Sequence, residues 1–156
     1  MAPSFDEHTA DDPLGRAAGK ARSVDGDGRP VLGVDTEVVL DGELLGKPAG
    51  AGEAAAMLGR LAGRAHEVVS GLCLRTPEWE ELHTSSTLVT FRALSEDAIA
   101  AYVDSGEWEG RAGAYAIQGL GAGLVERVDG DYLNVVGLPG ALLLTVLEHR
   151  RLLDGE

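Results

Sequence analysis

No stretch of this chain constrains its fold more than residues 31–45, with the sequence VLGVDTEVVLDGELL. The first part, Val31–Leu40, is rich in β-branched residues, which favour extended strands. Asp41-Gly42 is a dipeptide typical of two-residue hairpin turns, so Glu43–Leu45 can pair back as a second arm. We therefore predict a β-hairpin here and a fold built around a sheet.

Helical and extended patterns alternate through the rest of the chain. The apolar spacing and the capping residues predict helices over 14–24 and 52–61, from Ser95 to Gly106, and from Pro139 onward. Apolar or alternating runs predict strands over 66–74, 81–91, 124–128 and 132–136, with a loop over 119–123. This order predicts an α/β fold: one domain over residues 1–156 with a mixed, mostly antiparallel central sheet flanked by helices.

The balance of charge limits the partners of the chain. Thirteen basic residues against 26 acidic ones give a net charge of −13. Binding long nucleic acid requires a basic face, and the sequence has no cluster of Lys and Arg, so this class of partner is excluded. A nucleotide remains compatible with the charge, provided that a divalent metal and a few lysines neutralise its phosphates.

Cysteine content and hydropathy exclude further classes. Cys73 is the only cysteine, which rules out an internal disulfide and makes a structural zinc site improbable. The sequence has no apolar stretch of 18 residues and begins with an acidic segment, whereas a signal peptide is basic and then apolar. We therefore expect a cytoplasmic protein with no membrane partner.

Two glycine-containing stretches fail as nucleotide-binding motifs. In GELLGKP, residues 42–48, the second glycine comes too early for a phosphate loop, and Pro48 replaces the Ser or Thr that would bind magnesium. The GLGAG stretch at residues 119–123 lacks the GxGxxG spacing of dinucleotide-binding proteins. Neither stretch is interpreted as a site.

Asp35 is the candidate that the residues themselves single out. It lies inside an apolar strand, where a carboxylate is costly unless it is ionised and matched by a cation or metal. A carboxylate that faces solvent is an equally good interpretation. Lys20 and Lys47 could both reach the same cleft, although each alone is more commonly a solvated surface residue.

A series of motifs along the chain is more specific. In order these are FDE (residues 5–7), RAAGKA (16–21), GVDTEVVLDGELLGKP (33–48), TLVTFRALSEDAIAAYVDSGE (87–107) and RAGAYAIQGLGAGLVERVDGDYLNVVGLP (111–139). The chain resembles the Maf (septum-formation) family of nucleoside triphosphate pyrophosphatases from near residue 5 to the C-terminus. The resemblance implies a Maf/ITPase-like fold.

The resemblance also implies roles for individual residues. Asp35 would be the catalytic carboxylate and general base, and Glu7 a second acidic group that helps it to hold Mg²⁺ or Mn²⁺. Lys20 and Lys47 would contact the phosphates. Thr36 and Gln118 match the subtype that hydrolyses dTTP and UTP to the monophosphate and pyrophosphate, and the glutamine amide suits the O4/N3 edge of thymine or uracil.

One feature of the family has no counterpart here. Family members begin with a strand and a SxSPRR loop that grips the triphosphate, and Met1 falls just ahead of FDE. We expect Val31–Leu40 to be left as an edge strand, and the 156-residue chain to be less stable and nearly inactive without that segment. Arg16 also stands where the family has an apolar residue.

Three interpretations therefore remain open. The chain is an active pyrophosphatase once its upstream segment is included, or a non-catalytic remnant that keeps the fold and binds nucleotide weakly or not at all. The third, a pyrophosphatase of non-canonical purine nucleotides, is disfavoured by Thr36 and Gln118. The resemblance further suggests a homodimer.

Overall fold

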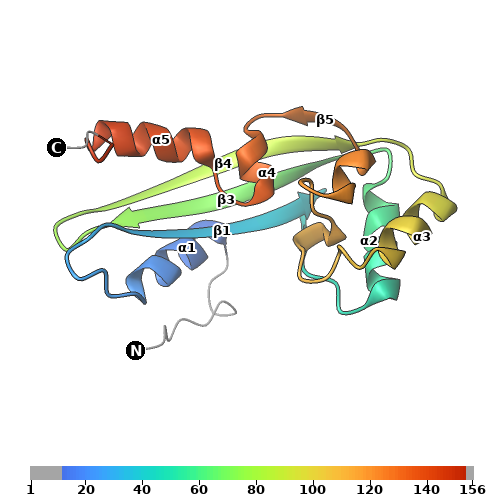
Figure 1. Ribbon diagram of the computed structural model, residues 1–156, viewed down its shortest axis with the longest axis horizontal. Coiled ribbons are helices and arrows are strands. Elements are labelled where there is room, and N and C mark those ends of the chain that lie inside the picture. Colours follow the sequence, from blue (N-terminus) through green and yellow to red (C-terminus); the bar gives the residue numbers. More distant parts are fainter. Residues whose placement is uncertain (1–11, 154–156) are drawn as a thin grey trace.

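The computed structural model describes residues 12–153, and its centre is a five-stranded sheet (Figure 1). The strands are β1 (Val31–Leu40), β2 (Glu43–Leu45), β3 (Ala65–Arg75), β4 (Glu80–Phe91) and β5 (Val125–Asp129). Their spatial order is β2-β1-β3-β4-β5. The predicted α/β class and the β1–β2 hairpin are confirmed. All four pairings described are antiparallel, so the sheet lacks the parallel component of the predicted mixed sheet within this range.

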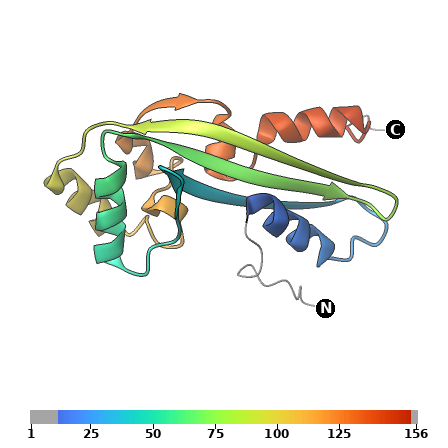
Figure 2. The ribbon, with the colours of Figure 1, turned by 180° about the vertical axis from the view of Figure 1, so that it is seen from behind.

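Among the described residues, one helix covers one face of the sheet and several elements cover the other (Figures 1 and 2). Helix α1 (Pro13–Arg22) packs on the first face against Cys73 of β3. On the second face, the largest core cluster joins β1, β3 and β4 to helices α2 (Ala51–Leu61) and α3 (Glu96–Asp104). Helix α5 (Gly140–His149) covers the far end of the same face through Val146, Leu72 and Leu74.

Two glycines let α1 lie directly on the sheet. A Cβ at Gly33 would lie 2.2 Å from the carbonyl oxygen of Ala17, and a Cβ at Gly71 would lie 2.4 Å from the carbonyl group of Pro13. Any side chain at these strand positions would push the helix away. Helix α1 itself begins where the Asp12 carboxylate accepts the backbone N–H of Gly15, an N-cap that supports its first turn.

The region that follows α3 departs from the predicted strands and loops. The segment 132–136, predicted as a strand, is the short helix α4 (Tyr132–Val136). The Asp131 carboxylate caps it by accepting the backbone N–H of Leu133, and Gly137, at φ 126°, ends it. The buried Asn134 then donates to the carbonyl of Val68 and to Thr87 Oγ1, which anchors α4 on the sheet. The preference of Val135 and Val136 for strands is overridden by these caps and contacts.

Two 3₁₀ turns, η2 (Ala112–Ala114) and η3 (Leu120–Leu124), connect α3 to β5. The predicted loop at 119–123 therefore corresponds to η3. No helix within residues 12–153 is long and apolar enough to cross a membrane.

Strand β1 has an open edge. Strand β2 pairs with it only at residues 38–40, and β3 pairs along its other side from Val31 to Val39. Within the described part of the chain, residues 31–37 therefore have no strand partner on the edge away from β3, whereas residues 38–40 of the predicted edge strand are paired with β2. Because side chains alternate along a strand, Asp35 and Glu37 face α1, whereas Thr36 and Val38 face the opposite side.

Candidate active site

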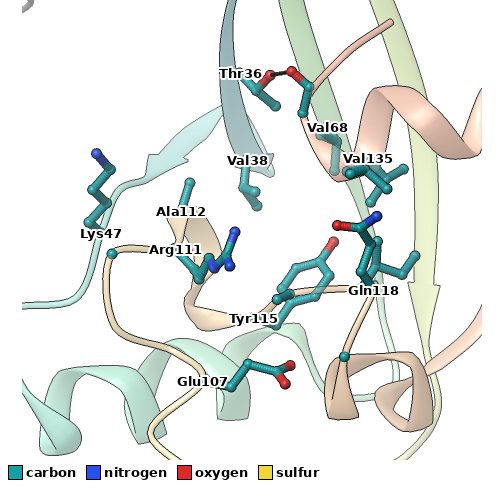
Figure 3. A pocket seen from close by; sticks show the side chains of 16 residues that line it. Thr36, Val38, Lys47, Val68, Glu107, Arg111, Ala112, Tyr115, Gln118 and Val135 are labelled. Carbon is teal, nitrogen blue, oxygen red and sulfur yellow. Dashed lines mark hydrogen bonds between the residues drawn. The ribbon is translucent and has the colours of Figure 1, made fainter. Parts of the chain in front are cut away.

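A cavity of about 430 Å³ lies on the Thr36 side of the sheet (Figure 3). Strands β1 and β3 form one wall, the segment from α3 through η2 to Gly119 forms the second, and the end of α4 closes the third. The lining residues from these walls include Thr36, Val38, Val68, Glu107, Arg111, Tyr115, Gln118 and Val135. Lys47 joins them from the segment after β2.

Thr36 is the most firmly held of the predicted residues in this cavity. Its Oγ1 lies 2.7 Å from Ser70 Oγ across the β1–β3 pairing, and it also contacts the carbonyl of Gly137 at 3.5 Å. Ser70 is fully buried. The threonine side chain is therefore fixed by the sheet and by the end of α4, and it presents a set orientation to the cavity.

Lys47 and Gln118 reach the cavity from opposite sides, and both are exposed (Figure 3). Gln118 lies between η2 and η3, and its amide can both donate and accept. Arg111, also exposed, adds a second cation to the Lys47 side. The cavity thus offers an amide at one end and positive charge at the other.

Asp35 lies on the opposite face of β1 from this cavity. Its Oδ2 is 2.7 Å from Arg16 Nε and its Oδ1 is 2.8 Å from Lys20 Nζ, and only 11% of its side chain is exposed. Arg16 also bridges to Glu37 at 2.7 Å. Burial alone would lower the pKa of Arg16, but hydrogen bonds to Asp35 and Glu37 raise it above its ordinary value. The carboxylate that the sequence singles out is therefore matched by cations, as its cost of burial requires.

The idea that both lysines enter one cleft is wrong for the described structure. Lys47 lines the cavity, whereas Lys20 pairs with Asp35 on the α1 side and is absent from the cavity lining. The cause is the two-residue period of β1, which sends Asp35 and Thr36 to opposite faces. The two faces of β1 meet at its open edge, over residues 31–37 within the described range.

A family model described as "Maf-like protein" matches residues 1–150. The chain belongs to the Maf-like family.

Several similar proteins are named dTTP/UTP pyrophosphatase. The chain is 48% identical to the one from Symbiobacterium thermophilum over 145 residues, which cover 88% of this chain and 75% of that protein. It is 51% identical to the one from Nitratidesulfovibrio vulgaris over 137 residues, 86% of this chain and 65% of the relative. For the protein of Pyrococcus furiosus, the identity is 45% over 118 residues, 76% of this chain and 62% of the relative.

Of the two carboxylates predicted to hold a metal in this Maf-like chain, only one lies among the residues that the structure describes. Glu7 lies outside residues 12–153, so only Asp35 of the predicted pair has described contacts. Within the described range, no group of three or more His, Cys, Asp or Glu side chains is arranged to hold a metal. Asp35 and Glu37 nevertheless put two carboxylates on one face of β1, and carboxylate oxygens are the ligands that Mg²⁺ prefers.

Four residues of the Maf-like site were not given roles by sequence reasoning. Arg16 was noted only as a departure from an apolar residue of the family, yet it binds Asp35 and Glu37. Glu107, Arg111 and Tyr115 line the cavity. Glu107 ends the 87–107 motif, and Arg111 and Tyr115 lie in the RAGAYAIQG part of the 111–139 motif, so their place in these motifs was the signal that could have found them.

Tyr115 connects the cavity to the core. Its hydroxyl lies 2.7 Å from His66 Nε2, and both rings pack edge-to-face with Phe91. Burial raises the pKa of Tyr115 and lowers the pKa of His66 to about 4. Tyr115 is therefore a neutral hydroxyl and His66 a neutral imidazole at ordinary pH, and together they form a rigid floor beneath the cavity.

Proposed function

We propose that this chain is a nucleoside triphosphate pyrophosphatase that hydrolyses dTTP and UTP to the monophosphate and pyrophosphate. The observation that carries the proposal is the convergence on one cavity of Thr36 from β1, Lys47 from the segment after β2 and, from a distant part of the sequence, Gln118. These are the residues that the resemblance assigned to substrate. The names of the Maf-like relatives support the same activity.

The pyrimidine base binds at the Gln118 end. A glutamine amide donates and accepts at once, which matches the O4 acceptor and N3–H donor of thymine or uracil. Thr36, held by Ser70 and Gly137, lies on the opposite wall and limits how far the base can enter the cavity. The apolar residues Val38, Val68 and Val135 line the space between them and suit a planar ring.

The phosphates extend toward the cations. Lys47 and Arg111 provide positive charge at the cavity, and charge-assisted hydrogen bonds to phosphate are the stronger kind. Lys20 approaches from the other side of the β1 edge, where its Nζ lies beside Asp35. A triphosphate that crosses this edge can share Lys20 with Asp35.

Asp35 acts as the general base. Its carboxylate accepts a proton from the water that attacks the α-phosphorus, and the bond between the α- and β-phosphates breaks to release pyrophosphate. The pairing with Arg16 and Lys20 orients the carboxylate.

A divalent metal would be held by Asp35 and, following the resemblance, by Glu7. Each oxygen of Asp35 lies beside one cation and keeps a second lone pair that could bind the metal. When bound, Mg²⁺ or Mn²⁺ would neutralise charge on the phosphates. A homodimer stays a prediction.

The test measures products and substrates together. The chain joined to the upstream SxSPRR segment that the resemblance implies is expected, with Mg²⁺, to release pyrophosphate from dTTP and UTP and to leave dGTP largely intact, whereas the 156-residue chain alone is expected to be nearly inactive. Asp35→Asn keeps the size of the side chain and removes the base, so turnover should fall about 10²-fold or more with an unchanged circular dichroism spectrum. Release of orthophosphate, a preference for purines, or full turnover in the variant would refute the proposal.

A further inference from the structure

Gln118 lies in a turn whose backbone is tied to a single carboxylate. Glu107 Oε2 accepts the backbone N–H of Leu120 at 2.9 Å, and Oε1 accepts that of Gly121 at the same distance. These two amides open η3, which is separated from Gln118 only by Gly119. A carboxylate at the start of a helical turn satisfies donors that have no partner within the turn.

A tyrosine holds the other side of the same turn. The Tyr102 hydroxyl donates to Glu107 Oε1 at 2.8 Å and accepts the backbone N–H of Ala116 at 3.0 Å. Tyr102 is buried in the main core cluster. Hydrogen bonds from one connected pair of side chains therefore bracket Gln118 from position 116 to position 121.

The turn also requires a close approach to this carboxylate. A Cβ at Gly119 would lie 2.2 Å from Glu107 Oε2, and a Cβ at Gly121 would lie 2.1 Å from the carbonyl oxygen of Ala116. Gly119 lets the backbone pass close to Glu107, and Gly121 lets the turn close on the backbone of Ala116. This close approach explains why the residue after Gln118 is a glycine.

Glu107 is an ionised acceptor in this network. Burial raises the pKa of its carboxyl, but hydrogen bonds from Tyr102 and from the amides of Gly121 and Leu120 outweigh burial and hold the pKa below its ordinary value. Three donors use most of the acceptor capacity of the carboxylate. Although Glu107 lines the cavity, it therefore acts on the turn more than on a ligand.

We infer that Glu107, with Tyr102 behind it, is a positioning residue that sets the Gln118 amide against the pyrimidine base and so determines base selectivity. The inference rests on the proposed function, because it assigns Gln118 to the base. The physical reason is that an amide selects a base only when its direction is fixed, and the backbone on both sides of Gln118 is fixed by this pair.

Glu107→Gln tests the inference with minimal change of shape. The new amide has one acceptor oxygen, and its NH₂ group opposes one of the two backbone donors. We expect the ratio of kcat/KM for dTTP to that for dGTP to fall about tenfold, through a higher KM for dTTP, with little change for dGTP. If Glu107 had only a structural role, its substitution would lower kcat/KM for dTTP and for dGTP by the same factor.

Glu109→Gln is the matched control. Glu109 is exposed, lies two residues away, and makes no side-chain hydrogen bond to any residue in the described range. It undergoes the same change of charge and should keep the wild-type selectivity. Tyr102→Phe removes the hydroxyl that contacts Glu107 and Ala116. We expect it to lower the ratio of kcat/KM for dTTP to that for dGTP as well, but by less than Glu107→Gln does.

Two further measurements do not depend on turnover. Hydrogen exchange at the amides of Leu120 and Gly121 should accelerate at least severalfold in Glu107→Gln and stay unchanged in Glu109→Gln. Calorimetry can compare the affinities for dTMP and dGMP, and it measures base selectivity even if the chain joined to its upstream segment hydrolyses no triphosphate. In that case the proposed function would be refuted while the inference about Glu107 could still be tested. Unchanged exchange, unchanged selectivity in Glu107→Gln, or equal binding of dTMP and dGMP by the wild type would overturn the inference.

Discussion

At the scale of single residues, charged and polar groups are placed by partners far away in sequence. Asp35 is paired with Arg16 and Lys20, and Glu107 accepts hydrogen bonds from backbone amides and a tyrosine. The cost of burying each carboxylate is offset by specific donors. Sequence reasoning found Asp35 because its strand is otherwise apolar, and it missed Glu107 because nothing adjacent to Glu107 marks it.

His66 provides a prediction at this scale. Burial lowers the pKa of His66 to about 4, whereas the unfolded chain has the ordinary value near 6.5. As pH falls from 6.5 toward 4, the unfolded state binds a proton that the folded state does not. The free energy of unfolding should therefore fall by about 3 kcal/mol over this window because of His66.

Urea denaturation of the wild type and of His66→Phe at several pH values measures this effect. The variant keeps an aromatic ring against Phe91 and Tyr115 and removes the titrating group. Its stability should decline less between pH 6.5 and 4, and the difference between the two proteins isolates His66 from the carboxylates. Equal declines would show that His66 is protonated in the folded protein.

At the scale of elements, the sequence was informative where a pattern is long and local. The β1–β2 hairpin has the predicted bounds, since β-branched residues and an Asp-Gly turn act together. The short segment 132–136 was misassigned because two valines outweighed the caps at Asp131 and Gly137 in the sequence reasoning. The buried contacts of Asn134, which decide the outcome, join residues 47 to 66 positions apart and have no local signature.

The packing of α1 on the sheet gives a prediction at this scale. Gly71→Ala places a Cβ 2.4 Å from the backbone of Pro13, so the helix or strand must shift. We expect the free energy of unfolding to fall by about 1–3 kcal/mol, as in other overpacked sites. Denaturant unfolding measures the change.

Gly59→Ala is the control for this substitution. Gly59 lies within α2, and a Cβ there meets nothing within 4 Å. Alanine in a helix interior is favoured over glycine by about 0.5–1 kcal/mol, so this variant should be stabilised. If Gly71→Ala were as stable as the wild type, the tight contact between α1 and β3 would be wrong.

At the scale of the whole molecule, the sheet separates two sets of polar groups. The cavity with Thr36, Lys47 and Gln118 lies on one face, and Asp35 with Lys20 lies on the other. Resemblance to a family supplied these residues, but only the structure shows the face that each occupies. The face depends on which helices cover the sheet, which is a property of long-range packing. The open edge of β1 is where base recognition and proton transfer come together in the proposed mechanism.

A crystal structure of this chain with Mg²⁺ and a non-hydrolysable analogue of dTTP tests that arrangement most directly. We expect the thymine ring in the cavity, with its O4/N3 edge within hydrogen-bonding distance of the Gln118 amide, and the phosphates running past Lys47 across the edge of β1 toward Lys20 and Asp35. An analogue bound elsewhere, or bound with its phosphates at Gln118 and its base at Lys47, would contradict the proposed site.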